Sequence, residues 1–184
     1  MSTRYLKKDN VVLVGIAKNG SQTIKQIGLS NNGFEIREQQ GEWNQDNFID
    51  WYDENLLILI PMRKPKERAL SEMIEHAVAH DIEKIFITKL NIFQNDVMKF
   101  FVKNIMLNEN WNGAQVKFFD LKLLSTHLPK YLGWDIKIPY YNTIKNNKLK
   151  EDLKEKLKNV KIETQEINEL FFDSIKKSKY WIKL

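Results

Sequence analysis

The sequence predicts an α/β protein in three layers, with a mainly parallel central sheet and helices on both faces. Two observations support this fold class. Short apolar, β-branched runs alternate with longer segments whose apolar residues recur at helical spacing. The two most apolar runs both end at loops that contain Gly or Pro together with basic residues. With 184 residues and no internal repeat or linker, the chain is expected to form a single domain over residues 1–184.

The first part of the chain is expected to alternate between strand and helix. Residues 1–10 are polar and charged and are assigned no element. The apolar run over residues 11–17 predicts a strand buried on both faces. After a polar loop, residues 23–29 predict a helix that ends at the Ser-Asn-Asn-Gly turn of residues 30–33. Residues 34–38 predict a second strand.

The same alternation continues to the end of the chain. A short helix is expected over residues 46–53, and the strongly apolar residues 56–60 predict a strand that stops at Pro61. Helical spacing of apolar residues then covers residues 66–80. The remaining expected elements are a helix over 95–107, a strand over 115–119, a helix over 121–131 and two charged helices over 148–179, divided near 159–164.

Composition narrows the class of protein. The 29 Lys+Arg exceed the 24 Asp+Glu and leave a net charge of +5, which suits a small phosphate-bearing ligand. The absence of cysteine excludes a disulfide framework, a thiolate nucleophile and a cysteine-based zinc site. No apolar run reaches the roughly 20 residues of a membrane span, and the first residues do not resemble a signal peptide. We therefore expect a cytoplasmic protein without a membrane partner.

The loop after the first apolar strand contains the groups that an anion cradle needs. Gly20 allows the backbone to turn closely, Ser21 and Thr23 offer hydroxyl groups, and Lys18 offers a positive charge. Ligands of open parallel sheets bind at such strand ends, next to helix N-termini. A plain polar turn is the alternative interpretation of this loop.

A nucleotide kinase would present the pattern G-x-x-x-x-G-K-[ST] at this position. Gly15 and Gly20 reproduce its glycine spacing, but Ser21 and Gln22 stand where that pattern has Lys and Ser or Thr. The lysine, Lys18, precedes the second glycine instead. The match to a kinase is therefore incomplete.

The loop after the second strongly apolar strand predicts a second anion site. Arg63 comes just past the strand, Pro65 shapes the turn, and Ser71 follows in the first turns of the next helix. A guanidinium and a hydroxyl that converge form a phosphate-binding pair. Two such sites at two strand ends imply a ligand with two separated anionic groups.

These two motifs resemble those of the sulfotransferases that use 3′-phosphoadenosine 5′-phosphosulfate. The family's first motif, Lys-x-Gly-[Ser/Thr]-[Ser/Thr] after a strand, is similar to residues 18–21. Its second, Arg-x-Pro-x-x-Arg-x-x-Ser, is matched at every fixed position by Arg63, Pro65, Arg68 and Ser71. Residues 116–121 and 138–143 resemble later family segments more loosely. The resemblance implies a P-loop NTPase-like topology and transfer of a sulfuryl group to an acceptor hydroxyl or amine that the sequence does not identify.

The resemblance also implies roles for individual residues. Lys18 would neutralise charge on the leaving phosphate, while Arg63 and Ser71 would bind the 3′-phosphate and so select this nucleotide over ATP. Arg68 is expected to be a structural ion-pair residue on the helix. The expected product is 3′,5′-adenosine bisphosphate, and the residues expected to bind the nucleotide are Lys18, Asn19, Gly20, Ser21, Gln22, Thr23, Arg63 and Ser71.

Glu38 is the first candidate for the general base. It shares a strand face with Ile36, so that partial burial would raise its basicity. A surface carboxylate without a catalytic role is the alternative, and Glu35 and Glu42 are further candidates. No metal is expected, because the three His do not cluster.

Three other interpretations stay open. The chain could be a P-loop kinase for a nucleotide or small molecule, or a family member that binds nucleotide without chemistry. Its basic charge and interleaved aromatic residues would also suit a nucleic-acid-binding module, but those aromatics fit core spacing better, so nucleic acid is not an expected partner. The patterns do not specify an oligomeric state.

Overall fold

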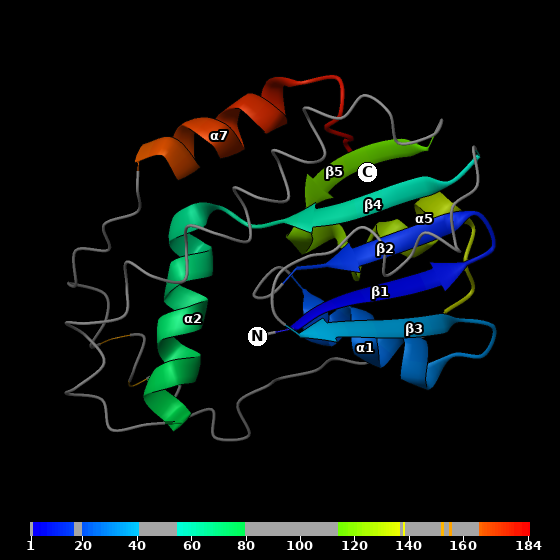
Figure 1. The fold of residues 1–184 in the computed structure, drawn as a ribbon, viewed down its shortest axis with the longest axis horizontal. Helices are drawn as coiled ribbons and strands as arrows, with labels where there is room; N and C mark the ends of the chain where they lie inside the picture. Colours follow the sequence, from blue (N-terminus) through cyan, green and yellow to red (C-terminus); the bar gives the residue numbers. More distant parts are fainter. Residues whose placement is uncertain are drawn as a thin grey trace.

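The computed structural model describes residues 2–16, 20–40, 55–79, 114–136, 138, 152, 155 and 166–184. These residues contain a five-stranded sheet with strand order β3-β1-β2-β4-β5 (Figure 1). The strands are β1 (Ser2–Lys8), β2 (Val11–Gly15), β3 (Glu35–Gln40), β4 (Leu57–Met62) and β5 (Gln115–Asp120). The helices are α1 (Ser21–Ser30), α2 (Pro65–Ala79), the short 3-10 helix η2 (Leu121–Leu123), α5 (Leu128–Leu132) and α7 (Glu166–Lys177).

The sheet is mixed, so the prediction of a mainly parallel sheet is confirmed only in part. Strand β2 pairs in parallel with β4, and β4 with β5, whereas β1 runs antiparallel to both β2 and β3. Strands β2, β3, β4 and β5 therefore point the same way, and β1 opposes them (Figure 1). Strand β1 was not predicted, because its Lys and Arg residues surround the apolar pair Tyr5 and Leu6, which are both buried.

The connections that follow β2 and β3 lead to opposite sides of the sheet, and β2 and β4 lie where this change of side occurs. From β2 the chain passes through α1 to β3 on one side, and it then reaches β4 on the other side of β2. In open α/β sheets, ligands bind at the carboxyl ends of the strands at such a point. The ends of β2 and β4 are therefore the place to look for a site.

Strands β2 and β4 pair over a short stretch only. Their register joins Val11, Val12 and Leu13 to Leu57, Ile58 and Leu59, while β4 and β5 pair from Leu57↔Gln115 to Met62↔Asp120. Pro61 lies beyond the β2 pairing, so its missing N–H is tolerated inside the strand. Strand β4 therefore continues through Pro61 to Met62, two residues past its predicted end at Ile60.

Apolar clusters of the described residues lie on both faces of the sheet. On one face, Phe172 and Ile175 of α7 pack on side chains such as Val14, Ile60 and Phe118. On the other face α1, the segment after β5 and the C-terminal residues cover a second cluster. Its buried members are Leu6, Val11, Leu13, Ile24, Ile27, Leu59, Phe119, Leu124 and Leu128.

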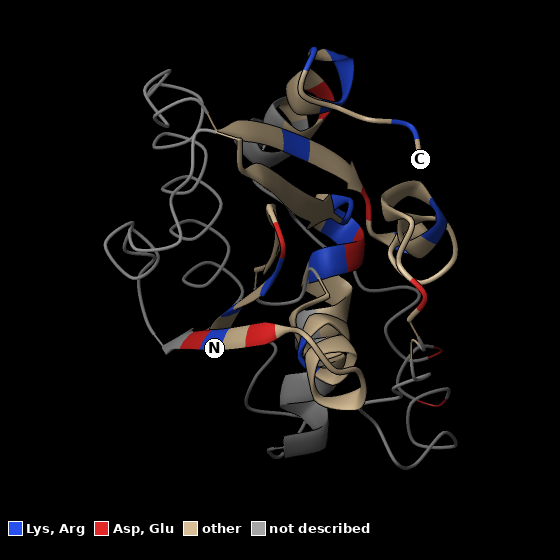
Figure 2. Cartoon of the chain, turned by 90° about the vertical axis from the view of Figure 1, so that its right-hand side faces the viewer, with Lys and Arg blue, Asp and Glu red and all other residues tan. Residues whose placement is uncertain are grey.

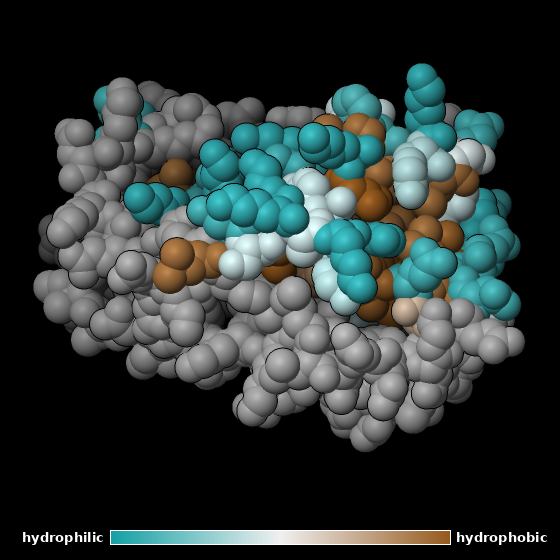
Figure 3. Space-filling view, turned by 90° about the horizontal axis from the view of Figure 1, so that it is seen from above, coloured by the Kyte–Doolittle hydropathy of each residue, from teal (hydrophilic) through white to brown (hydrophobic). Residues whose placement is uncertain are grey.

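The C-terminal residues close the β5 edge of the sheet. The Phe118 amide donates to the Tyr180 carbonyl at 2.8 Å, and the Ile182 amide donates to the Phe118 carbonyl at 2.8 Å. A paired edge does not invite association with another strand. Basic residues mark the surface around it, at the end of α7 and on β5 (Figure 2), and seen from above this side is mostly hydrophilic with apolar patches between (Figure 3).

Most other predicted elements agree with the structure. Helix α1 begins two residues before its predicted start and ends at Ser30, one residue past its predicted end. The single helix predicted over residues 121–131 is wrong: the chain forms η2, a turn and then α5. Asp120 caps η2 by accepting from the Lys122 amide at 2.9 Å, and Pro129 can occupy only the first turn of a helix.

The helices predicted over 46–53 and 95–107 lie outside the described residues. Of the first charged C-terminal helix the structure describes only Asp152 and Glu155. None of the helices in the described ranges is both long and apolar enough to cross a bilayer.

Candidate functional site

The N-terminus of α1 offers backbone amides to a ligand. Gly20 stands before the helix with φ 84°, and as a glycine it has no side chain with which to cap the helix. The first helical hydrogen bond runs from the Ile24 amide to the Gly20 carbonyl at 2.9 Å, so the amides of Ser21, Gln22 and Thr23 have no partner within the helix. The first turn also contains no acidic residue. Such a terminus attracts an anion.

Both glycines of the first loop are required by close packing. A Cβ atom on Gly15 would lie 2.7 Å from the Cα atom of Ser21 and 3.2 Å from its amide nitrogen. A Cβ atom on Gly20 would lie 2.6 Å from the Cδ1 atom of Leu121, and its positive φ disfavours any other residue. The start of α1 is therefore held directly against the end of β2 and against η2.

We expect Gly15→Ala to disturb this arrangement. The new methyl group meets backbone rather than a movable side chain, so the free energy of unfolding in urea should fall by about 1–3 kcal/mol. Gly33→Ala is the matched control, because Gly33 has φ 82° but open space around it, so only backbone strain of roughly 1–2 kcal/mol applies. Anion binding should weaken for Gly15→Ala alone; equal binding by the two variants would contradict this role.

The structure places the described residues of the first motif together. Ser21 is 8 % exposed, and Gln22 and Thr23 are half-buried on the first turn of α1. Lys18 and Asn19 lie outside the described residues, so their predicted roles stay predictions.

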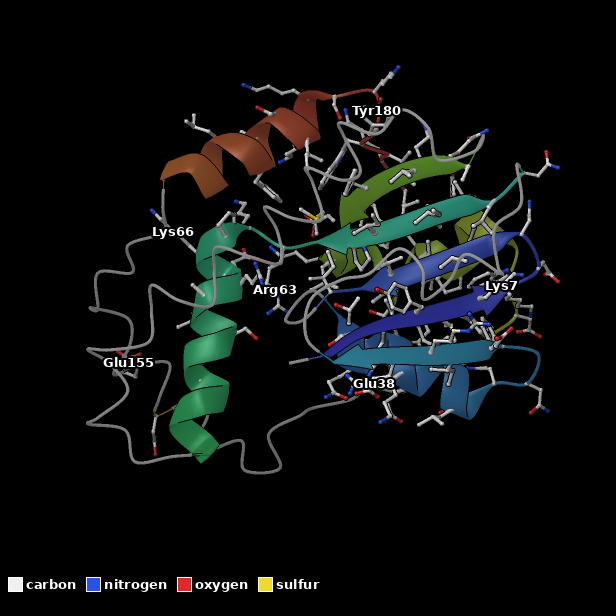
Figure 4. All side chains as sticks on the ribbon, viewed as in Figure 1. Lys7, Glu38, Arg63, Lys66, Glu155 and Tyr180 are labelled. Carbon is white, nitrogen blue, oxygen red and sulfur yellow. The ribbon has the colours of Figure 1, made fainter. Side chains whose placement is uncertain are left out.

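Arg63 lies between the end of β4 and helix α2 (Figure 4). Burial lowers the pKa of Arg63, and the negative charge of Glu67 opposes this shift more weakly. Among the residues that the structure describes, none forms a hydrogen bond or ion pair with its guanidinium. A partly desolvated arginine without a paired carboxylate is suited to an anionic ligand.

Helix α2 carries the rest of the second motif. Pro65 is its first residue, one position before the predicted start, and the Arg68 amide donates to the Lys64 carbonyl at 2.9 Å. Ser71 is half-buried and follows buried Arg68 by three positions, so the two share one face of the helix. Arg68 has a partner in the structure, in keeping with the structural role expected for it.

The two motifs meet through the segment that follows β5. Gly20 packs against Leu121 and Leu124 of this segment, and its Cβ position is 3.8 Å from Pro61 of β4. Lys122 of the same segment forms an ion pair with Glu67 of α2 at 3.5 Å. Lys122 and Glu67 were not predicted to belong to this region, because no local sequence pattern shows that η2 and α2 adjoin.

Glu38 lies near the carboxyl end of β3 (Figure 4). It forms an ion pair with Arg4 at 3.0 Å, and its other oxygen lies 3.7 Å from the Lys25 ammonium of α1. The Glu38 side chain is 35 % exposed. Its two cationic neighbours were not foreseen, since they come from a strand that the sequence analysis missed and from the middle of α1.

Glu35, the alternative base, lies at the opposite end of β3. It pairs in register with Lys7, three residues before Glu38 and so about 10 Å away along the strand. It forms an ion pair with Arg37 at 2.9 Å. Glu42 lies outside the described residues.

Within the described ranges, no cluster of three or more His, Asp or Glu side chains could hold a metal ion. No protein-family model matches the chain, and neither a curated protein nor a solved structure matches it.

Proposed function

We propose that this protein is a sulfotransferase that moves a sulfuryl group from 3′-phosphoadenosine 5′-phosphosulfate to a hydroxyl or amine acceptor. The observation that carries the proposal is the position of the two motifs. They follow β2 and β4, the neighbouring parallel strands at which the chain reverses its direction across the sheet. We further propose that the parallel part of this mixed sheet corresponds to a P-loop NTPase-like topology.

The first turn of α1 would bind the 5′-phosphosulfate end of the donor. The amides of Ser21, Gln22 and Thr23, which have no partner within the helix, and the positive end of the helix favour a group with several anionic oxygens. Gly20, with φ 84°, allows the tight turn that starts the helix at these amides. These features fit the donor's anionic end without a metal ligand.

Arg63 and Ser71 would bind the 3′-phosphate. A guanidinium can donate two parallel hydrogen bonds to a phosphate, and a hydroxyl adds a third. ATP lacks a 3′-phosphate, so this pair would select the sulfuryl donor. The lack of an ion pair for Arg63 among the described residues supports this role.

The chemical step would be an in-line displacement at sulfur. The acceptor oxygen or nitrogen forms a bond to sulfur as the bond between sulfur and the 5′-phosphate oxygen breaks, and the bisphosphate leaves. Lys18 would neutralise the charge that develops on the leaving phosphate. The acceptor's proton would pass to the carboxylate of Glu38. Glu38 lies on β3, which is separated from β2 by β1, so its Cα atom is about 10 Å from that of Gly15.

Calorimetry with adenosine 3′,5′-bisphosphate and with ATP–Mg²⁺ tests the proposal. We expect the bisphosphate to bind at least about tenfold more tightly, which corresponds to about 1.4 kcal/mol. Equal affinity, or a preference for ATP–Mg²⁺, would refute the proposal and favour a P-loop kinase instead.

A further inference from the structure

Arg4 of β1 lies under the first turn of α1. It pairs in register with Gly15 on one side and with Glu38 on the other. Arg4 precedes Leu6 by two residues, so both side chains point to the same face of the sheet. Leu6 packs there against Ile24 and Ile27 of α1. Cβ atoms of cross-strand neighbours are about 5 Å apart, and the Cβ position of Gly15 is 3.2 Å from the Ser21 amide nitrogen.

The guanidinium of Arg4 is buried and only partly satisfied. The Arg4 side chain is 7 % exposed, and its Nη2 atom donates to the Glu38 carboxylate at 3.0 Å. Its Nε atom is buried and has no hydrogen-bond partner in the described part of the chain. Leaving a buried donor unsatisfied costs about 1–3 kcal/mol, and more for a charged group. A ligand that accepts a hydrogen bond from this N–H group would therefore be stabilised.

Among the described residues, positive charges outnumber negative ones around this arginine. Arg4 and Lys25 bring two positive charges to the single carboxylate of Glu38. The positive end of α1 adds to them, and the first turn of α1 contains no acidic residue that would offset it.

We propose that Arg4 is a further binding residue of this site. Its free Nε–H group would donate a hydrogen bond to an oxyanion bound at the first turn of α1. This inference rests on the proposed function, in which that oxyanion is the 5′-phosphate end of the sulfuryl donor. Arg4 and Arg63 then serve opposite ends of one ligand. Glu38 holds the Arg4 guanidinium in place.

Two single-phosphate probes separate the two ends. Removing Arg4 alone would leave Glu38 without its partner, so the comparison is between Glu38→Gln and the double variant Arg4→Gln/Glu38→Gln. We expect the double variant to bind adenosine 5′-monophosphate about tenfold more weakly than the single variant does. Its affinity for adenosine 3′-monophosphate should be unchanged, and Arg4→Lys should retain part of the binding of the 5′-probe.

The exposed pair Glu35 and Arg37 on β3 provides the control. Glu35→Gln/Arg37→Gln changes the same residue types on the same sheet and should leave both affinities unaltered. Unfolding in urea checks that each variant is folded. Equal binding of the 5′-probe with and without Arg4, or no binding of this probe by the wild-type protein, would overturn the inference.

The same data distinguish this inference from the proposed function. If the wild-type protein does not prefer the bisphosphate to ATP, the sulfotransferase proposal fails. Arg4-dependent binding of adenosine 5′-monophosphate would still support the anion site under α1.

Discussion

Arg63→Met should remove the preference for adenosine 3′,5′-bisphosphate over ATP. Methionine keeps an apolar stem of similar length but loses the charge and the donors that would bind the 3′-phosphate. Hydrogen bonds to charged groups contribute about 1.5–3 kcal/mol each, so we expect the affinity for the bisphosphate to fall by about 10- to 100-fold. Affinity for adenosine 5′-monophosphate should barely change. Calorimetry with the three nucleotides measures these effects.

Lys66→Met is the matched control for the loss of a nearby positive charge. Lys66 is exposed and lies on the opposite side of α2 from Arg63 (Figure 4). Its replacement should lower the affinity for every nucleotide slightly and equally, because it changes only the long-range field. A similar loss of selectivity in both variants would show that net charge, rather than the Arg63 guanidinium, determines the preference.

The fold should tolerate Arg63→Met. Burial lowers the pKa of Arg63, so the folded state holds its positive charge less readily than the unfolded state does. Arginine stays protonated at neutral pH, and its charge therefore opposes folding over the whole ordinary pH range. The free energy of unfolding of Arg63→Met should consequently equal or exceed that of the wild-type protein. Lower stability would indicate that Arg63 has a structural partner.

The fold was predictable wherever one residue pattern determined the local structure. The continuous apolar runs fixed β2 and β4, and the turn before Gly33 ended α1 as expected. Strand β1 was missed, because Arg4 is a buried charge whose partners come from β3 and α1. Such a residue looks exposed in the sequence and is explained only by tertiary contacts. Pro129 indicated a break before α5. The apolar residues around it recur at helical spacing, and this pattern led to the prediction of one continuous helix.

The site was predictable where it depends on short segments. Gly20, Ser21, Arg63 and Ser71 lie at strand ends and helix starts, and the order of elements is enough to place them. The charges that surround them were not predictable. Lys122 reaches Glu67 from a helix more than fifty residues away along the chain. Sequence spacing carries no information on such pairs, because the packing of α2 beside η2 creates them.

Glu38→Gln should lower turnover by at least about 100-fold if Glu38 accepts the acceptor's proton, the range expected for loss of a general base. The amide keeps the size of the side chain and can still accept a hydrogen bond from Arg4, but it cannot take up a proton. Affinity for adenosine 3′,5′-bisphosphate should stay within a few-fold of the wild-type value. Release of the bisphosphate from the sulfuryl donor, followed with a panel of phenols, sugars and amines, measures turnover.

Glu35→Gln separates catalysis from the general loss of a carboxylate on β3. Glu35 lies at the amino end of the strand, away from the ends of β2 and β4, so turnover should remain at the wild-type rate. Unaltered turnover in Glu38→Gln would leave Glu38 as the counter-ion of Arg4 and Lys25 and move the base elsewhere. A parallel loss of affinity and turnover in Glu38→Gln would point the same way, because a base that acts only in the transition state affects turnover alone.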